Sequence, residues 1–317
     1  MTRPAVRDLL AANPVVLAPM AGVTDKAFRT LCIEHGAQIT YSEMISAKGL
    51  EYANERTHHL IEPAPAEEHF AVQLFGHEPD VMAAQAVAVA EELGERLAFI
   101  DVNMGCPVPK VHKKGEGSGL MRTPDLAAEI VAAMVKACGP LGVEITAKIR
   151  SGWDDASVNA VEVARCLEQA GAAAIGVHGR TAKQLYRGKA DWGVIADVAR
   201  AVSVPVIGSG DVMSAADAKR MLQETGAAAA FAARGAMGNP WIFNGHEPTS
   251  AERIQAARRH LQLYVQFYGE RYLSPLRAQL ARYVYGQPGA TDIRRALGAA
   301  QALADYERIL ADALERA

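Results

Sequence analysis

The chain has 317 residues, of which 50% are apolar and 22% are charged, and its formal net charge is −3. This composition is ordinary for a globular enzyme and excludes wholesale disorder and fibrous repeats. No apolar run reaches the roughly 18 residues of a membrane helix without charge, glycine or proline, so we expect no membrane span. Pro4, Arg7, Asp8 and Pro14 interrupt the apolar core that a signal peptide would need, so we expect a cytoplasmic protein.

Short β-rich runs alternate with helix-like stretches along the first part of the chain. The predicted strands lie at 15–18, 38–43, 70–75, 98–103, 145–150, 173–178, 204–209 and 227–233. The predicted helices lie at 25–35, 79–93, 124–138, 157–170, 192–202 and 214–224. Near-continuous apolar strands are typical of parallel sheets covered on both faces. The pattern predicts an α/β fold, a (β/α)8 TIM barrel. A doubly wound open sheet is less favoured, because no GxGxxG follows the first strand.

A barrel of this kind places its active site at the carboxyl ends of its strands. Read in chain order, these ends carry Met20, Glu43, Gln73, Asn103 with Cys106, Lys148 with Arg150, His178 with Arg180, Ser209 with Asp211, and Arg234. Any one of them could simply cap a loop. Polar or reactive groups at nearly every end, however, indicate a site that many strands build together.

Two glycine-containing segments follow the last two predicted strands, IGSGD at 207–211 and AARGAMGNPW at 232–241. Barrels often bind phosphate at this position, where glycine lets backbone N–H groups approach the anion and an arginine adds a fork for its oxygens. Two such segments after consecutive strands therefore favour a site for a phosphorylated cofactor over two ordinary turns.

Lys148 stands within the apolar strand TAKIR, which has no carboxylate of its own. A buried lysine is costly unless it serves a site, where it could form a Schiff base or hold negative charge on a cofactor. His178 ends another apolar strand. It could be a hydrogen-bonded structural residue, or it could contact a flavin or a substrate.

None of the four cysteines, Cys32, Cys106, Cys138 and Cys166, belongs to a CxxC pair. Zinc and iron–sulfur spacings are absent, so we expect no metal. Three of these cysteines read as core residues. Cys106 differs, because it stands before Pro107 where a strand opens into the basic segment DVNMGCPVPKVHKKGEGSG, 101–119. This placement favours a reactive thiol.

The charge is unevenly distributed. Residues 251–295 carry eight arginines and three carboxylates, a charge of +5, whereas the first 250 residues carry −6. Six aromatic residues, Tyr264, Phe267, Tyr268, Tyr272, Tyr283 and Tyr285, are interleaved with these arginines. The pattern suits phosphate contacts and base stacking, and it equally suits a helical bundle with tyrosines at its core edges and arginines pointing outward.

The segments VLAPMAGVTDKAFRTLC, VQLFG, DVNMGCPVPKVHKKGEGSGL, KIRSGW, VHGRT and RGAMGNPWIF, between residues 15 and 243, resemble the tRNA-dihydrouridine synthases, and most of all the bacterial B-type branch. The resemblance implies an FMN-binding TIM barrel over residues 1–244 and a helical tRNA-binding domain over residues 245–317. It also implies that NADPH is the reductant and that a tRNA uridine is reduced to 5,6-dihydrouridine. Neither a membrane nor an obligatory protein partner is expected.

The resemblance also implies roles for single residues. Pro19, Met20 and Ala21 would line the FMN ring, and Gln73 and Lys148 would contact its polar edge. The remaining FMN contacts would be His178, Ser209, Gly210, Asp211, Ala233 and Arg234, the last five near the phosphate. Asn103 and Arg180 would touch the target uracil. The chain departs from the family at Ser209, where asparagine is usual, and at Ala233, where glycine is usual, so backbone contacts are expected to carry the phosphate site.

Cys106 would be the proton donor in this reaction. It must then keep its proton at neutral pH, which requires a pKa near or above the ordinary thiol value of ~8.5. We therefore expect Lys110, Lys113 and Lys114 to point away from the sulfur. We also expect the loop to swing about Gly115, Gly117 and Gly119.

Three other functions remain open from the sequence. A flavin barrel acting on a small pyrimidine, like dihydroorotate dehydrogenase, would share Lys148 and the phosphate loops but would not need the basic tail. A Schiff-base lyase would use Lys148 without a flavin. A non-catalytic RNA-binding protein on a degenerate barrel would not need both Cys106 and Lys148.

Overall fold

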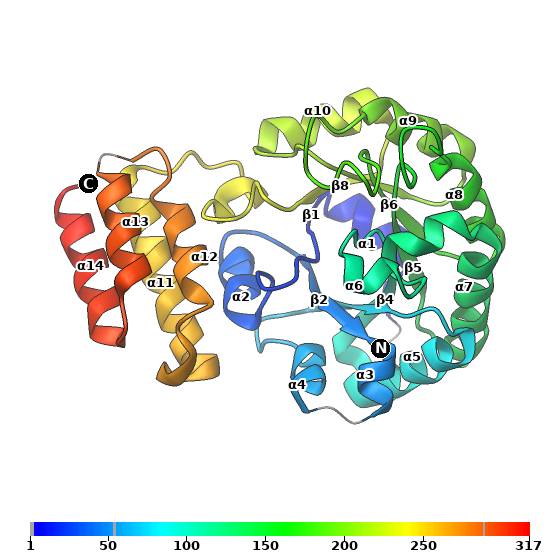
Figure 1. The fold of residues 1–317 in the computed structure, drawn as a ribbon, viewed down its shortest axis with the longest axis horizontal. Coiled ribbons are helices and arrows are strands. Elements are labelled where there is room, and N and C mark those ends of the chain that lie inside the picture. The colour runs from blue at the N-terminus through cyan, green and yellow to red at the C-terminus, as the bar shows by residue number, and fades with distance from the viewer. Residues whose placement is uncertain (1–2, 53–54, 288) are drawn as a thin grey trace.

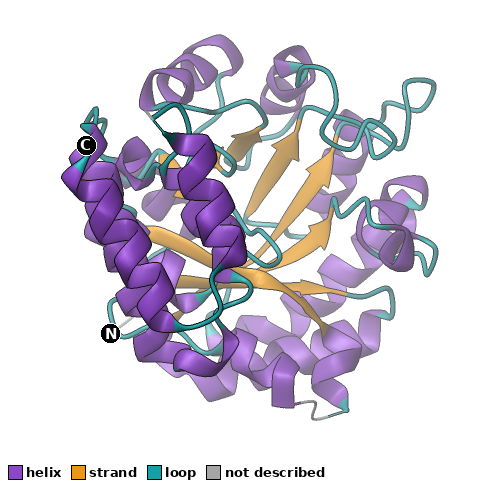
Figure 2. Cartoon of the chain, turned by 60° about the vertical axis from the view of Figure 1, so that its left-hand side comes forward, coloured by secondary structure: helices purple, strands orange, loops and turns teal. Residues whose placement is uncertain are grey.

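The computed structural model describes residues 3–52, 55–287 and 289–317. Eight parallel strands form one sheet in the order β1-β8-β7-β6-β5-β4-β3-β2. Their bounds are β1 Val15–Leu17, β2 Ile39–Ser46, β3 His69–Phe75, β4 Leu97–Met104, β5 Ile145–Arg150, β6 Ala174–His178, β7 Val206–Ser209 and β8 Ala229–Ala232. With helices outside the strands, the sheet curves into a TIM barrel (Figures 1 and 2), which confirms the predicted fold class.

Helices return the chain between successive strands. They are α2 Lys26–Glu34, α3 Ala47–Glu51, α4 Glu55–His58, α5 Pro79–Leu93, α6 Pro109–His112, α7 Pro124–Cys138, α8 Ala160–Gln169, α9 Trp192–Ala201 and α10 Ala215–Thr225. The predicted helices match α2, α5, α7, α8, α9 and α10 within three residues at each end. Start signals explain the agreement, because Asp25 and Ser214 cap α2 and α10 through their side chains.

An additional helix, α1 Val6–Ala12, precedes the barrel and was not predicted. Its residues Val6, Leu9 and Leu10 are buried in one cluster with the inward-facing rings of Tyr41 and Phe99. The helix therefore covers apolar side chains inside the barrel. The helix is too short for its apolar residues to form a recognisable helical pattern, and the apolar strand β1 follows almost directly.

Strand register brings the predicted polar residues into rows across the barrel. One row pairs Gln73 with Asp101 and Asp101 with Thr146. A second pairs Asn103 with Lys148. Because side chains along a strand alternate between two faces, residues two apart, such as Asp101 and Asn103, share a face.

The C-terminal helices α11 Ser250–Tyr268, α12 Leu276–Tyr283, α13 Ala290–Ala299 and α14 Leu303–Glu315 stack beside the barrel (Figure 1). Their apolar cluster includes Ala27, Leu31 and Trp241 from the barrel segment. Within the bundle, Tyr264 and Tyr283 are buried, whereas Tyr272 and Tyr285 are exposed. The aromatic residues thus serve both the core and the surface of the bundle.

Within the described residues, no helix combines the length and apolar character needed to cross a membrane.

Candidate active site

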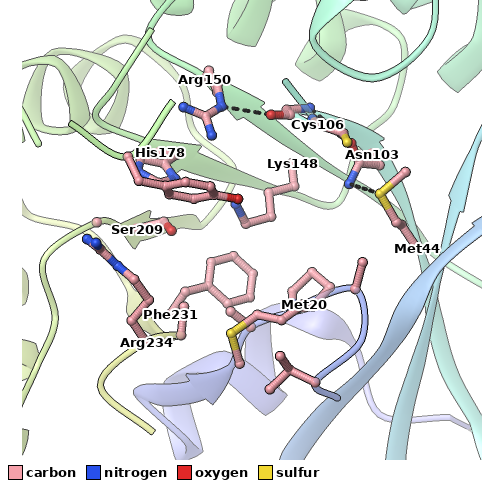
Figure 3. Close-up of a pocket in the computed structure, with 18 of the residues that line it drawn as sticks. Met20, Met44, Asn103, Cys106, Lys148, Arg150, His178, Ser209, Phe231 and Arg234 are labelled. Atoms are coloured by element: carbon pink, nitrogen blue, oxygen red, sulfur yellow. Dashed lines mark hydrogen bonds between the residues drawn. The ribbon is translucent and has the colours of Figure 1, made fainter. Parts of the chain in front are cut away.

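A cavity of about 440 Å³ opens at the carboxyl ends of the strands. Its lining includes every predicted site residue but one: Pro19, Met20, Ala21, Gln73, Asn103, Cys106, Lys148, His178, Ser209, Gly210, Asp211, Ala233 and Arg234. Figure 3 shows how the side chains of Lys148, Phe231 and Met20 face this common space. The ends of many strands therefore build one cavity together.

The floor and one wall of the cavity are apolar, formed by Met20, Met44 and Phe231 among others. Lys148 lies over this wall, with Nζ 5.4 Å from the centre of the Phe231 ring. Burial lowers the pKa of Lys148 to about 8, the positive charge of Arg150 acts in the same direction, and the carboxylate of Asp101 opposes both. Lys148 is thus a cation at neutral pH, and an anionic partner in the cavity would stabilise its charged form.

His178 is held neutral. Burial lowers its pKa well below the ordinary value, and the positive charges of Lys148, Arg150, Arg180 and Arg234 add to this effect. Its Nε2 lies 3.4 Å from Arg180 Nη1. Arginine can only donate, so Nε2 accepts and the ring proton resides on Nδ1.

Arg180 does not line the cavity. Its side chain is buried, with 1% of the residue exposed, and Nη2 donates to Asp211 Oδ1 at 2.7 Å and Oδ2 at 2.8 Å. Further donations go to the carbonyls of Arg187 and Gly188. In this structure the guanidinium is held behind the cavity wall by a carboxylate 31 residues away in the sequence. The predicted contact of Arg180 with uracil stays a prediction.

Asp211 joins Arg180 to the cavity rim. Arg234 Nη2 donates to Asp211 Oδ1 at 3.0 Å, and the backbone N–H of Ala190 donates to Asp211 Oδ2 at 2.7 Å. The hydrogen bonds from Ala190 and Arg180, together with the charges of Arg180 and Arg234, lower the pKa of Asp211 against the effect of its burial. Its negative charge is thus compensated, and the exposed Arg234 is held at the edge of the cavity.

Backbone donors gather beside Arg234. In the described part of the chain, the N–H groups of Asp211, Val212, Arg234 and Gly235 donate to no other protein group. Gly210, with a φ of +114°, allows the turn, and a Cβ there would lie 2.6 Å from the Cβ of Ala190. Unpaired N–H groups on two neighbouring loops, with an arginine beside them, are what an anion such as phosphate requires.

Cys106 stands at the opposite side of the cavity on a loop of residues 105–116, the Cys106 loop. Its backbone carbonyl accepts from Ser118 N at 3.0 Å, and a Cβ on Gly117 would lie 3.0 Å from the Cβ of Cys106. Burial raises the pKa of the Cys106 thiol, while the Val108 N–H and the charges of Arg150 and Lys110 oppose the shift. The thiol therefore keeps its proton at neutral pH.

The lysines of the Cys106 loop, Lys110, Lys113 and Lys114, are exposed. The charge of Lys110 nevertheless lowers the pKa of the Cys106 thiol, so the prediction that all three point away from the sulfur stays a prediction. The loop is also packed on its outer side, where the ring of His112 meets Trp153 edge-on at 4.9 Å. Glycine at 117 serves close packing against Cys106 in this conformation, and the predicted swing of the loop stays a prediction.

Several cavity residues had no predicted role, and Arg150 and Tyr186 are two of them. Arg150 Nε donates to the carbonyl of Gly105 at 2.7 Å, and Nη1 donates to the carbonyls of Thr181 and Leu185 at 2.9 and 2.8 Å. Arg150 thus ties the Cys106 loop to the loop after β6. Its position at a strand end was visible in the sequence, but its partners were not.

Tyr186 is the second. It is 58% exposed, lines the cavity, and has the guanidinium carbons of Arg150 and Arg234 at 5.6 and 5.8 Å from its ring centre. It belongs to the irregular loop between β6 and α9, where sequence pattern assigns no direction to a side chain. An aromatic ring flanked by two cations at a cavity mouth is suited to contact a planar ring.

The donor set fits FMN. The cavity size falls in the range of cofactor sites, about 300–1,000 Å³. Its apolar walls suit a flat aromatic ring, Lys148 suits the electron-rich pyrimidine edge, and the unpaired N–H groups with Arg234 suit the phosphate.

Comparison with known proteins identifies the family. Residues 16–317 match the family described as "Dihydrouridine synthase (Dus)". A probable tRNA-dihydrouridine synthase of Treponema pallidum (strain Nichols) is 37% identical over 94% of this chain and 92% of its own. A tRNA-dihydrouridine synthase B of Pseudomonas aeruginosa is 39% identical over 89% of this chain and 87% of its own.

Solved structures are more distantly similar. A nitroalkane oxidase from Streptomyces ansochromogenes has a TM-score of 0.43 and 18% identity, covering 96% of each chain. The match to the family extends over nearly the whole sequence, including the cavity residues and the C-terminal helices, and the chain belongs to the dihydrouridine synthase family.

Proposed function

We propose that this protein reduces a uridine of tRNA to 5,6-dihydrouridine, with FMN as its cofactor and NADPH as the reductant. The observation that carries the proposal is one cavity lined by Lys148, by the unpaired backbone N–H groups beside Arg234 and by the half-buried Cys106, whose thiol pKa is raised by burial. A cytoplasmic location is part of the same proposal.

The cofactor's contacts follow from the cavity. Pro19, Met20 and Ala21 would lie against the ring, and Lys148 would hold negative charge at its pyrimidine edge. The 209–211 loop and Ala233–Arg234 would bind the phosphate through backbone N–H groups. Neutral His178 would donate through Nδ1, because its Nε2 is occupied by Arg180.

Reduced FMN, when bound, supplies a hydride to carbon 6 of uracil. The protein must then deliver a proton to carbon 5, which carries enolate character. The S–H bond of Cys106 breaks, its proton forms the new C5–H bond, and the thiolate later regains a proton from solvent. Arg150, whose charge favours the Cys106 thiolate, stabilises the sulfur once the proton has left.

The uracil would lie between Cys106 and the flavin site, with Tyr186 at the mouth. Asn103 Nδ2 donates to Gln73 Oε1 at 2.7 Å and to the weak acceptor Met44 Sδ at 4.0 Å. A uracil carbonyl would replace the Met44 sulfur as the acceptor of the second N–H. The target nucleotide must leave its stack to reach this point, which costs a few kcal/mol that ring contacts would offset.

The exposed arginines of α11–α13 favour a macromolecular substrate over a small pyrimidine. A dihydroorotate-dehydrogenase-like reaction would need the cavity alone. The bundle would bind tRNA phosphates, and such contacts make affinity depend steeply on salt.

The direct test uses purified protein. It should be yellow with the absorbance of bound flavin, and with NADPH it should convert an unmodified tRNA transcript to a product heavier by one H2 in a single uridine. A colourless protein that binds no FMN, or a flavoprotein that leaves tRNA unchanged while reducing a free pyrimidine, would overturn the proposal.

A further inference from the structure

A chain of buried hydrogen bonds runs from the middle of the barrel to the backbone of Cys106. Thr146 Oγ1 donates to Asp101 Oδ1 at 2.6 Å, and Gln73 Nε2 donates to Asp101 Oδ2 at 2.6 Å. Asn103 Nδ2 donates to Gln73 Oε1 at 2.7 Å, and the backbone N–H of Cys106 donates to Asn103 Oδ1 at 2.9 Å. The four side chains are each at most 9% exposed.

The direction of this chain follows from donor and acceptor chemistry. An ionised carboxylate only accepts hydrogen bonds, so the Gln73 amide must turn its nitrogen toward Asp101. The Gln73 oxygen then faces Asn103. That oxygen accepts from the Asn103 nitrogen, so the Asn103 oxygen is the atom that accepts from the N–H of Cys106. Reversing either amide would leave buried groups without partners, which is costly.

Asp101 makes no direct contact with the cavity, although its charge raises the pKa of Lys148. It stands in register between Gln73 and Thr146 on the inner face of the barrel. Burial raises its pKa to about 6, while the hydrogen bonds from Gln73 and Thr146 and the charge of Lys148 oppose the shift. It is therefore ionised at neutral pH despite being buried.

We propose that Asp101 is a positioning residue whose carboxylate sets the direction of the Gln73 and Asn103 amides and thereby holds the backbone of Cys106 at the cavity. The functional meaning of this role rests on the proposed function of Cys106. The positioning itself can be tested without cofactor or substrate.

Thr146 makes the test specific, because a hydroxyl can donate or accept. In Asp101→Asn, the new amide can still accept from Gln73 through its oxygen while its nitrogen donates to Thr146, so the chain keeps its direction. In Thr146→Val, the carboxylate loses one donor but still accepts from Gln73. Only the double variant leaves the new amide nitrogen at position 101 without an acceptor at position 146. The amide at 101 then no longer presents a fixed oxygen to Gln73, and the Gln73 and Asn103 amides lose their fixed direction.

The readout is hydrogen–deuterium exchange of the Cys106 backbone amide in the cofactor-free protein, with iodoacetamide alkylation of the Cys106 peptide as a second measure. Each single variant should exchange within about threefold of wild type. The double variant should exchange at least about tenfold faster, the effect of one lost hydrogen bond. Its Cys106 should also alkylate faster, because the loop is no longer held.

Glu67→Gln is the matched control. Glu67 is a buried carboxylate that accepts from Arg29 and Thr40 on the side of β2 and α2, so its loss lowers stability without touching the chain to Cys106. A double variant with wild-type exchange at Cys106, or a Glu67→Gln protein with equally fast exchange there, would overturn the proposal. If instead the exchange result holds but Cys106→Ala still turns over tRNA at the wild-type rate, the positioning stands and the proposed function of Cys106 fails.

Discussion

The buried Arg180 and the partly exposed Asp211 form an ion pair in which one guanidinium nitrogen contacts both carboxylate oxygens, at 2.7 and 2.8 Å. The pair holds the loop after β7 on the side away from the cavity. Asp211 also accepts a hydrogen bond from Arg234, which positions Arg234 at the cavity rim. Arg180 therefore supports the loop that would hold the cofactor's phosphate and does not reach the cavity where the substrate would lie.

Arg180→Met should weaken FMN binding by about tenfold, because it removes the charged hydrogen bonds that hold the Asp211 carboxylate, and with it the 209–211 loop, in place. In FMN-saturated enzyme the KM for tRNA should remain within about twofold of wild type. The measurement is a fluorescence titration with FMN followed by steady-state kinetics at saturating FMN. A normal FMN affinity together with a raised KM for tRNA would instead place Arg180 at the uracil.

Lys148→Met should weaken FMN binding by roughly 10- to 100-fold, the loss expected for a hydrogen bond to a charged group. The wild-type affinity should fall as the pH rises through about 8, since burial lowers the pKa of Lys148 to that value and the neutral amine no longer attracts the flavin edge. His178 stays neutral over this range and does not contribute. The FMN affinity measured between pH 7 and 10 should therefore fall with pH for wild type and stay constant for the variant. Equal slopes would remove Lys148 from the flavin contact.

Gly210→Ala should abolish stable FMN retention, because its Cβ would meet Ala190 at 2.6 Å and displace the 209–211 loop. Gly226→Ala is the matched control. Gly226 also has a positive φ, +72°, but no atom lies within 4 Å of its added Cβ. It should lose about 1 kcal/mol of stability and keep its FMN. If both variants retain flavin equally, the loop does not bind the phosphate.

The arginines of the C-terminal bundle differ in whether they contact other residues of the bundle or are exposed. Arg277 donates to Tyr306 and to the carbonyl of Ala300, so it serves the bundle itself. Arg271 and Arg282 are exposed and form no ion pair in residues 3–52, 55–287 and 289–317. Alanine at 271 or 282 should reduce the salt dependence of tRNA affinity by about one phosphate contact each and leave the melting temperature unchanged. Alanine at 277 should mainly lower the melting temperature. An unchanged salt slope in both surface variants would argue against this face as the tRNA contact.

Deletion of residues 245–317 is a coarser test of the same idea. It should abolish tRNA binding and leave a barrel that still takes up FMN. It also uncovers Leu31 and Trp241, which pack in the apolar cluster of the bundle. The single-residue variants avoid this exposure.

Most of the barrel could be predicted because parallel strands buried on both faces leave apolar runs, and because Asp25 and Ser214 mark where helices begin. The site followed from topology, since the ends of the strands must meet. What could not be predicted were partners from distant parts of the chain. Nothing near Arg180 in the sequence points to Asp211, and nothing near Lys148 points to Asp101 on the neighbouring strand.

Cys106→Ala tests the central claim most directly. Stopped-flow absorbance follows flavin reduction by NADPH and, separately, reoxidation of the reduced flavin by tRNA. The variant should bind FMN and be reduced by NADPH at the wild-type rate, while tRNA-dependent reoxidation slows by about 10²- to 10⁴-fold, the contribution of a general acid. Unchanged tRNA-dependent reoxidation would contradict the account, because the proton would then come from another group.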